Sequence, residues 1–231
     1  MNPVKVEPQG FNGVFWVLFE DGSRRLATRN LAPGRVVYGE RLVKFQGVEY
    51  RVWDPYRSKL AAAILKGLKV FPLKEADKVL YLGAATGTTA SHVSDIVGLG
   101  GRVYCVDFAE RVVRELTNNV CAYRPNMFPI LADARNPEIY RFMVEKVNFI
   151  YCDVAQPEQA KILADNAELY LKRDGKAAIA VKARSIDVTK EPSEVFKHEV
   201  KVLEDRGFRR VDAVNLEPYD KAHSLIVVEY R

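Results

Sequence analysis

The sequence predicts an α/β fold, with a parallel sheet covered by helices on both faces and a small β-rich lobe in front of it. Two observations support this prediction. Residues 79–181 alternate short apolar runs with segments of helical periodicity, a pattern typical of a buried parallel sheet. The residues before 57 instead form short strand-like segments separated by turn residues. We therefore expect a small β-rich N-terminal lobe at residues 1–56 and a sheet domain at residues 57–231.

The N-terminal lobe is expected to contain a β-hairpin. Two strand-like segments, residues 13–20 and 24–28, flank the Asp-Gly dipeptide at 21–22, which favours a tight hairpin turn. A second turn is expected at the Gln-Gly dipeptide 46–47. Further short strands are expected at residues 36–40, 42–45 and 48–53.

The sheet domain is expected to open with a helix at residues 58–67. Ser58 can cap its N-terminus, Ala and Leu fill it, and Gly67 ends it. Parallel strands are expected at residues 79–82, 103–107, 127–131, 149–153 and 176–181, and the helices between them at 89–96, 110–122 and 157–171. After a helix at 193–206, strands at 209–216 and 224–230 are expected to add an antiparallel edge.

Composition limits the classes of protein that this chain can be. With 231 residues, 48% hydrophobic and 28% charged, the chain can bury a sizeable core. It has no apolar stretch of membrane-spanning length, and residues 1–10 lack the apolar core of a signal peptide. We therefore expect a cytoplasmic protein without a membrane partner. Cys105, Cys121 and Cys152 lack the spacing of metal ligands, so we expect reduced thiols and no bound metal.

The segment at residues 79–89 carries the clearest functional signal, a strand followed by a Gly loop and a helix. Gly83 and Gly87 allow a sharp turn and a close approach of ligand to backbone. The spacing does not match the dinucleotide fingerprint, and no Lys follows Gly87 as in a phosphate-binding loop. A looser loop suits a ligand without phosphates, such as S-adenosyl-L-methionine. In the alternative interpretation, the two glycines only shape a turn.

Further cofactor-binding candidates stand at strand ends, because ligands of open α/β sheets bind outside the carboxyl ends of the strands. Asp107 is placed to bind ribose hydroxyls, Phe108 to stack on adenine, and Asp133 to accept a hydrogen bond from its amino group. The alternatives are that Asp107 caps the next helix and that Asp133 forms an Asx turn at 132–136. The full set of expected cofactor-binding residues is Gly83, Ala84, Ala85, Thr86, Gly87, Thr88, Thr89, Asp107, Phe108, Asp133, Ala134, Asp153 and Gln156.

Asp153 and Lys182 each end an apolar strand with a charged residue. If the two strands are adjacent, the two side chains lie side by side. Burial would lower the pKa of Lys182 towards that of a useful base, whereas Asp153 would oppose the shift and orient the amine. The sequence leaves open which of these effects dominates.

Residues 82–98 resemble the signature of fibrillarins, the ribose 2′-O-methyltransferases of box C/D guide-RNA particles. The similarity continues at residues 56–62, 153–156 and 217–219. It implies a class I (Rossmann-like) SAM-dependent methyltransferase sheet of roughly seven strands, with S-adenosyl-L-methionine as the cofactor. It also implies an active-site set of two lysines, one aspartate and one histidine, which fall on Lys59, Asp153, Lys182 and His223.

The resemblance implies roles for these residues and a set of partners. Lys182 would act as the base or its electrostatic equivalent, with Asp153 orienting it, and Lys59 would add positive charge; His223 would orient a lysine or only satisfy the terminal turn. The substrate would be rRNA, and possibly tRNA, at sites chosen by box C/D guide RNA. A Nop-family scaffold protein and a kink-turn-binding protein would complete the particle, with the Arg-rich N-terminal lobe as a docking face. A net charge of +5 is small for a protein that holds RNA alone, which agrees with this dependence.

Two features differ from the family pattern. Asp107 stands where we would expect Glu, which shortens the reach to the ribose, and the Gly/Arg-rich tail of eukaryotic members is missing, which indicates an archaeal protein. Two other functions stay open, a methyltransferase of a different (protein) substrate and a non-catalytic subunit of an RNA–protein particle. The Lys-Asp-Lys set argues against the first, and the intact strand-end residues argue against the second.

Overall fold

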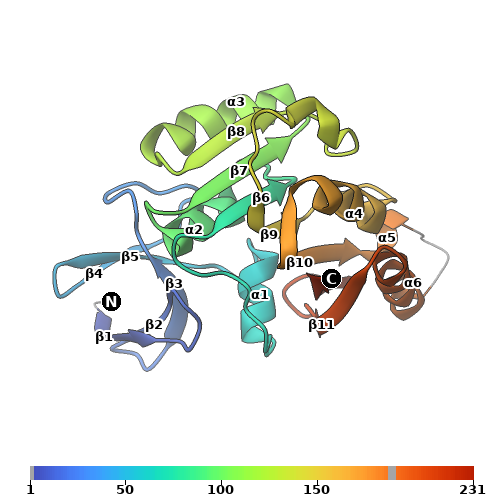
Figure 1. Ribbon diagram of the computed structural model, residues 1–231. Helices are drawn as coiled ribbons and strands as arrows, with labels where there is room; N and C mark the ends of the chain where they lie inside the picture. The colour runs from blue at the N-terminus through green and yellow to red at the C-terminus, as the bar shows by residue number, and fades with distance from the viewer. Residues whose placement is uncertain (1–2, 187–190) are drawn as a thin grey trace.

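Two sheets form the frame of the protein (Figure 1). The computed structural model describes residues 3–186 and 191–231. The N-terminal sheet is antiparallel and consists of β1 (Pro3–Pro8), β2 (Val14–Phe19), β3 (Arg24–Arg29), β4 (Leu42–Phe45) and β5 (Val48–Val52). Its spatial order is β1-β2-β3-β5-β4. The expected hairpin of β2 and β3 is confirmed, as is the turn between β4 and β5.

The N-terminal sheet differs from expectation at two places. Strand β1 was not expected, because it has a proline at each end and proline disfavours strands. It lies at the edge of the sheet, where residues without an N–H to donate to a neighbouring strand are tolerated. The strand expected at residues 36–40 is wrong, since this segment is a loop. The Glu40 carboxylate accepts the backbone N–H groups of Val37 at 3.0 Å and Tyr38 at 2.8 Å, which holds the segment in a turn.

The second sheet has seven strands in the order β11-β12-β10-β9-β6-β7-β8. Its parallel part consists of β6 (Lys78–Leu82), β7 (Arg102–Asp107), β8 (Met127–Leu131), β9 (Val147–Cys152) and β10 (Leu171–Lys182). Strand β12 (His223–Tyr230) lies antiparallel between β10 and β11 (Phe208–Asn215). The expected parallel strands and antiparallel edge are therefore confirmed.

Helices cover both faces of the second sheet. One core cluster joins its first face to α1 (Lys59–Leu65), α2 (Thr88–Val97) and α3 (Glu110–Asn119). The other joins its second face to α4 (Gln159–Tyr170), the short α5 (Ala183–Ile186) and α6 (Pro192–Asp205). Two 3-10 turns, η1 (Cys121–Tyr123) and η2 (Pro137–Tyr140), complete the described elements; η1 takes up the end of the helix expected at 110–122. Figure 1 shows α1 between the N-terminal sheet and the C-terminal strands.

The two sheets share a core and a buried ionic cluster. Asp95 of α2 accepts hydrogen bonds from Arg51 of β5 at 2.8 Å, from Arg124 at 2.6 Å and from the Thr28 hydroxyl of β3 at 2.7 Å. The side chains of Asp95 and both arginines are at most 2% exposed. The apolar cluster that contains α1 and α2 also contains Val14, Leu26 and Trp53 from the N-terminal part. The N-terminal lobe and the sheet domain are thus packed as one unit.

Two further findings concern features noted in the sequence. Within residues 3–186 and 191–231, no helix is long and apolar enough to span a membrane. The three cysteines are free, and burial raises the pKa of the Cys121 thiol to about 11 and that of the Cys152 thiol to about 12. Protonated thiols bind metals poorly.

Candidate active site

The Gly loop between β6 and α2 is held in a conformation that requires glycine. Gly83 has a φ of 79°, and a Cβ atom there would lie 2.5 Å from the carbonyl oxygen of Asp153. Gly87 has a φ of 92° and forms the N-cap of α2. Ala85, between them, also adopts a left-handed φ of 48°, and its N–H donates to Asp107 Oδ2 at 3.0 Å. Strained backbone of this kind gathers at ligand sites.

A cavity of about 250 Å³ opens at this loop, at the carboxyl ends of β6, β7, β8 and β9. It lies at this edge because the parallel strands all end there. Most of the expected cofactor-binding residues line it: Gly83, Ala85, Asp107, Phe108, Asp133, Ala134, Asp153 and Gln156. The remaining ones, Ala84, Thr86, Gly87, Thr88 and Thr89, belong to the loop and the start of α2 and do not line it.

The cavity has the chemistry that an adenosine with a sulfonium group requires. Phe108 is an exposed aromatic ring at its wall and is free to stack on a base. The buried Oε1 atom of Gln156 has no hydrogen-bond partner in the described part of the chain, so an acceptor is available there. The carboxylates of Asp107, Asp133 and Asp153 favour a positively charged ligand. S-adenosyl-L-methionine therefore fits these residues.

Asp107 and Asp133 each combine a structural contact with a position in the cavity. Asp107 Oδ1 accepts the N–H of Ala109 at 3.1 Å, next to the start of α3, while its other oxygen holds the Gly loop. Asp133 forms the Asx turn that was the alternative interpretation, accepting the Arg135 N–H at 2.9 Å. Hydrogen bonds from the Arg135 side chain lower the pKa of Asp133, which therefore stays ionised. The ligand roles of both residues remain predictions.

The four residues expected to be catalytic come together at the same edge. Lys59, the first residue of α1, donates to both carboxylate oxygens of Asp153 at 2.9 and 3.0 Å, and both side chains are 23% exposed. Lys182 ends β10, and His223 begins β12 directly opposite it in the antiparallel register. Ser58 positions Lys59, because its hydroxyl caps α1 and accepts a hydrogen bond from Thr89 of α2 at 3.0 Å.

One expected contact is wrong: Asp153 does not pair with Lys182. The two strands are adjacent, but Cys152 is level with Ile179, so Lys182 stands two residues beyond Asp153. Two residues of strand amount to about 6.6 Å. Asp153 forms its ion pair with Lys59 instead. Within the residues described, the ammonium of Lys182 forms no hydrogen bond or ion pair.

The structure adds two residues that the sequence did not indicate. The Asp220 carboxylate lies 2.9 Å from His223 Nδ1 and 3.9 Å from Lys59 Nζ, so it stands between the two sides of the site. The buried Gln159 accepts the N–H of Lys182 at 3.2 Å and donates to the Val154 carbonyl at 2.6 Å. It thereby fixes the ends of β9 and β10 relative to each other. The spacing of Asp220 and His223, three residues apart at a turn, could have indicated the first, whereas nothing in the sequence distinguishes Gln159.

Comparison with known proteins gives a consistent result over the whole chain. The fibrillarin family model matches residues 6–231. A fibrillarin-like rRNA/tRNA 2′-O-methyltransferase of Methanopyrus kandleri is 56% identical over 231 residues, which cover 100% of this chain and 99% of the relative. The crystal structure of Aeropyrum pernix fibrillarin with natively bound S-adenosyl-L-methionine is 55% identical, with a TM-score of 0.92 over 99% of this chain and 100% of that one. A crystal structure of a fibrillarin/Nop5p complex is 44% identical, with a TM-score of 0.83 over 95% of this chain and 98% of that one.

Proposed function

The chain belongs to the fibrillarin family, and we propose that it is an RNA ribose 2′-O-methyltransferase that uses S-adenosyl-L-methionine and acts on rRNA and tRNA. The observation that carries this proposal is the ammonium of Lys182, which is unpaired among the described residues and stands at the same sheet edge as a cavity that suits the cofactor. A lysine without a counterion at the end of a buried strand is available to a reacting oxygen. Lysines that only support structure are paired or solvated.

The residues of the cavity would hold the cofactor, which supplies a methyl group on a positively charged sulfur. Asp107 would accept hydrogen bonds from the ribose hydroxyls, and the Gly loop to which it is bonded would set its position. Phe108 would stack on the adenine, and Gln156 Oε1 would accept a hydrogen bond from a cofactor N–H or O–H group. Asp153, held by Lys59, would face the positive charge of the sulfonium.

We propose that Lys182 is the residue that contacts the 2′-oxygen of the target ribose. As an ammonium it would stabilise the negative charge that develops on that oxygen during its attack on the methyl group, and the hydroxyl proton would leave to water. As a neutral amine it would instead accept that proton itself. His223 Nδ1 lies 2.8 Å from the Lys221 carbonyl oxygen, which can only accept, and 2.9 Å from an Asp220 carboxylate oxygen, so Nδ1 carries a ring proton. Its Nε2 atom is then free to accept a hydrogen bond from the amine opposite it in the register. Asp220 is a positioning residue in this scheme.

The two alternative functions are less well supported. Attack by an amine or a carboxylate of a protein substrate would not need an ammonium such as that of Lys182 at the reacting atom. A non-catalytic subunit would not need, at one edge, the strained Gly loop together with a Gln156 Oε1 atom and a Lys182 ammonium that have no partner among the described residues.

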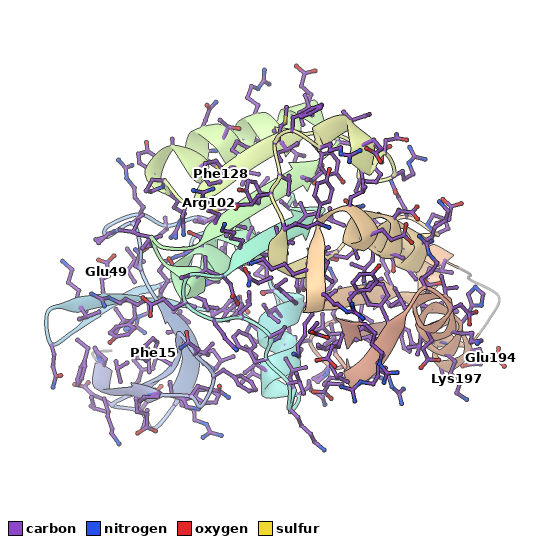
Figure 2. All side chains as sticks on the ribbon, in the orientation of Figure 1. Phe15, Glu49, Arg102, Phe128, Glu194 and Lys197 are labelled. Atoms are coloured by element: carbon purple, nitrogen blue, oxygen red, sulfur yellow. The ribbon has the colours of Figure 1, made fainter. Side chains whose placement is uncertain are left out.

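We propose that box C/D guide RNA, with a kink-turn-binding protein, addresses the enzyme, and that a Nop-family scaffold docks on exposed apolar residues at the β8 edge. A relative of this chain is known in a fibrillarin/Nop5p complex. Exposed large apolar side chains lie along β8 and the segment after it: Phe128, Leu131, Ile139, Phe142 and Met143. Figure 2 shows Phe128 at this edge of the sheet. Such a patch is typical of a protein interface. We prefer it to the N-terminal lobe, where most of the exposed charged residues are basic.

The test is a methyl-transfer time course on a matched RNA, with and without scaffold, kink-turn protein and guide, at about 200 mM salt. We expect the lone protein to bind RNA weakly and to lose most of that binding between about 50 and 200 mM salt. Transfer should require all the added components. Site-specific 2′-O-methylation by the lone protein would contradict guide dependence, while transfer to protein and not to RNA would contradict the proposed function itself.

A further inference from the structure

One wall of the cofactor cavity is formed by the ends of two neighbouring strands, β7 and β8. Their register pairs Asp107 with Leu131, and the N–H of Ala132 donates to the Asp107 carbonyl oxygen at 3.0 Å. Phe108 and Asp133, which follow these strand ends, both line the cavity. Because it combines an exposed aromatic ring with a carboxylate, this wall suits a base that carries an amino group.

The backbone of the segment after β8 is held by side chains of helix α4. Asn166 Nδ2 donates to the Ala134 carbonyl oxygen at 2.8 Å, and the Tyr170 hydroxyl donates to the Pro137 carbonyl oxygen at 2.5 Å. Both of these α4 side chains are buried. A change in an exposed side chain of this segment should therefore leave the path of its backbone unaltered.

The carboxylate of Asp133 is fixed by three hydrogen bonds from Arg135. Its Oδ1 atom accepts the backbone N–H of Arg135 at 2.9 Å, and its Oδ2 atom accepts Nε at 2.9 Å and Nη2 at 2.6 Å. The residues found to line the cavity in the described part of the chain do not include Arg135. Arg135 therefore holds the carboxylate from outside the cavity.

These contacts leave a defined part of the carboxylate for a ligand. A carboxylate has about four acceptor positions, roughly two on each oxygen. The guanidinium occupies both positions on Oδ2, whereas Oδ1 has accepted one N–H and can accept another. The Asp133 side chain is 22% exposed and lines the cavity. A hydrogen-bond donor of a ligand can therefore bind here, and an acceptor cannot.

We propose that Arg135 is a specificity-determining residue, which makes the cavity select a purine with a 6-amino group. With Oδ2 held by the guanidinium, Oδ1 accepts the amino N–H of adenine. A 6-oxo purine would instead place an oxygen against an ionised carboxylate, and the two negative groups repel each other. The inference rests on the proposed function, because its ligand is the adenosyl group of the cofactor. Arg135 is a positioning residue, since it acts through Asp133.

Without the guanidinium, the carboxylate of Asp133 would lose its fixed orientation. The χ2 torsion of Asp has a broad energy minimum, so a carboxylate without these bonds samples several orientations and exposes both oxygens to water. The preference for an amino group would then decrease. Arg135→Lys should restore part of it, because an ammonium supplies the charge but not the planar fork of N–H donors.

The test is calorimetric titration of the protein with S-adenosyl-L-homocysteine and with S-inosyl-L-homocysteine, in which a 6-oxo group and an N1–H replace the 6-amino group and N1. Neither ligand can donate a methyl group, so the readout is binding alone. We expect the wild-type protein to prefer the adenosyl ligand by roughly a hundredfold. Arg135→Ala should lower this ratio of affinities about tenfold, and Arg135→Lys should give a ratio between the two.

Arg141→Ala is the matched control. Arg141 is an exposed arginine that lies 3.4 Å from Glu138, and neither of these residues is among those found to line the cavity within residues 3–186 and 191–231. Both alanine variants should melt near the wild-type temperature. A wild-type protein with equal affinity for the two ligands, or Arg135→Ala with the same ratio as Arg141→Ala, would overturn the inference.

A double variant tests whether Arg135 acts through Asp133. Asp133→Ala should by itself remove most of the preference for the adenosyl ligand. Adding Arg135→Ala to Asp133→Ala should then change the ratio little further, because the carboxylate that Arg135 positions is already gone. Additive effects of the two changes would show that Arg135 acts elsewhere and would overturn its positioning role.

Methyl transfer by the complete particle separates this inference from the proposed function. A wild-type protein that binds neither ligand would contradict the proposed function, and with it the inference. A protein that shows the expected ratios but transfers no methyl group to RNA would contradict the proposed reaction and support the role of Arg135. Normal transfer and normal binding of S-adenosyl-L-homocysteine, with ratios that Arg135→Ala does not change, would contradict the inference alone.

Discussion

Two clusters of charged side chains, one at the junction of the sheets and one at the catalytic edge, differ in how completely they are paired. At the junction of the two sheets, Asp95 is buried and satisfied by Arg51, Arg124 and Thr28. At the catalytic edge the groups are partly open to solvent, and Lys182 has no partner among the residues that the structure describes. The cluster around Asp95 therefore offers no unpaired charge to a ligand, whereas the catalytic edge offers the ammonium of Lys182.

This difference distinguishes charged residues that stabilise the fold from charged residues that take part in the reaction. Removing one member of a buried, fully paired set leaves the other charges uncompensated in a low dielectric, so the free energy of unfolding decreases. Removing an unpaired charge at an open edge leaves the fold intact, but it raises the activation free energy of a reaction that the charge assists. The predictions below test stability at the junction, and turnover and cofactor binding at the catalytic edge and its cavity.

The largest expected effect is on stability at the junction. Asp95→Ala should lower the free energy of unfolding by about 3–5 kcal/mol, because Arg51 and Arg124 would remain buried with less compensating charge. Urea denaturation followed by circular dichroism measures it. The matched control is Asp205→Ala, which removes an exposed carboxylate paired with Lys201 and should leave the midpoint near wild type. Equal midpoints for the two variants would mean that the junction is not a structural centre.

The next effect is on turnover at the catalytic edge. Lys182→Ala should lower single-turnover methylation about a hundredfold, or about 2.7 kcal/mol in the barrier, and leave the melting temperature and cofactor affinity nearly unchanged. Lys182→Arg should also fail, because Arg does not release its proton at working pH. If cofactor affinity fell as far as turnover, Lys182 would be structural.

A smaller effect is expected on cofactor binding. Asp107→Ala should weaken S-adenosyl-L-methionine at least tenfold, about 1.4 kcal/mol, through loss of a ribose contact and of the bond to Ala85. Calorimetric titration checks this value. An unchanged affinity would show that Asp107 serves only the start of α3.

The smallest effect is a pH dependence of stability at the junction. His92 is fully buried between Thr28 and Tyr38, and burial, with the nearby Arg51 and Arg124, lowers its pKa well below the usual 6.5. As the pH falls through 6.5, the unfolded chain takes up a proton that the folded chain refuses, so stability is retained above this pH and lost below it. The loss should be about 0.8 kcal/mol at pH 6.

The measurement is the difference in unfolding free energy between pH 8 and pH 6, compared with that of His92→Gln. The variant removes this titration, so its difference should be smaller by about the same amount. A variant with the same pH dependence as wild type would show that other groups account for it.

The sequence predicted the fold largely because its local signals agree. Apolar runs end at Gly83 and Asp107, and Ser58 precedes a run of helix-forming residues, so each signal lies within a few neighbouring positions. The pairing of Asp153 depends instead on the register of β9 against β10, which no local pattern contains. The expected contact with Lys182 was wrong for this reason.

The junction could not be predicted either. Arg51 lies 44 positions from Asp95, and Arg124 a further 29, with nothing in between to relate them. Charged residues are expected at the surface, so these three would be assigned to solvent. The loop at Glu40 was missed because its turn is made by a side chain, whereas the apolar residues around it favour a strand.

The buried junction also has a consequence for the order in which the protein can be made. The ribosome completes Arg51 before the 44 residues that lead to Asp95 exist, and Arg124 follows later still. At about 5–20 residues per second, the N-terminal sheet waits roughly 2–9 seconds for its partner helix. During that interval Leu26 and Trp53 have no second layer to cover them. The nascent chain therefore passes through a stage in which it is open to association with other proteins, and a fragment that stops before α2 would remain there.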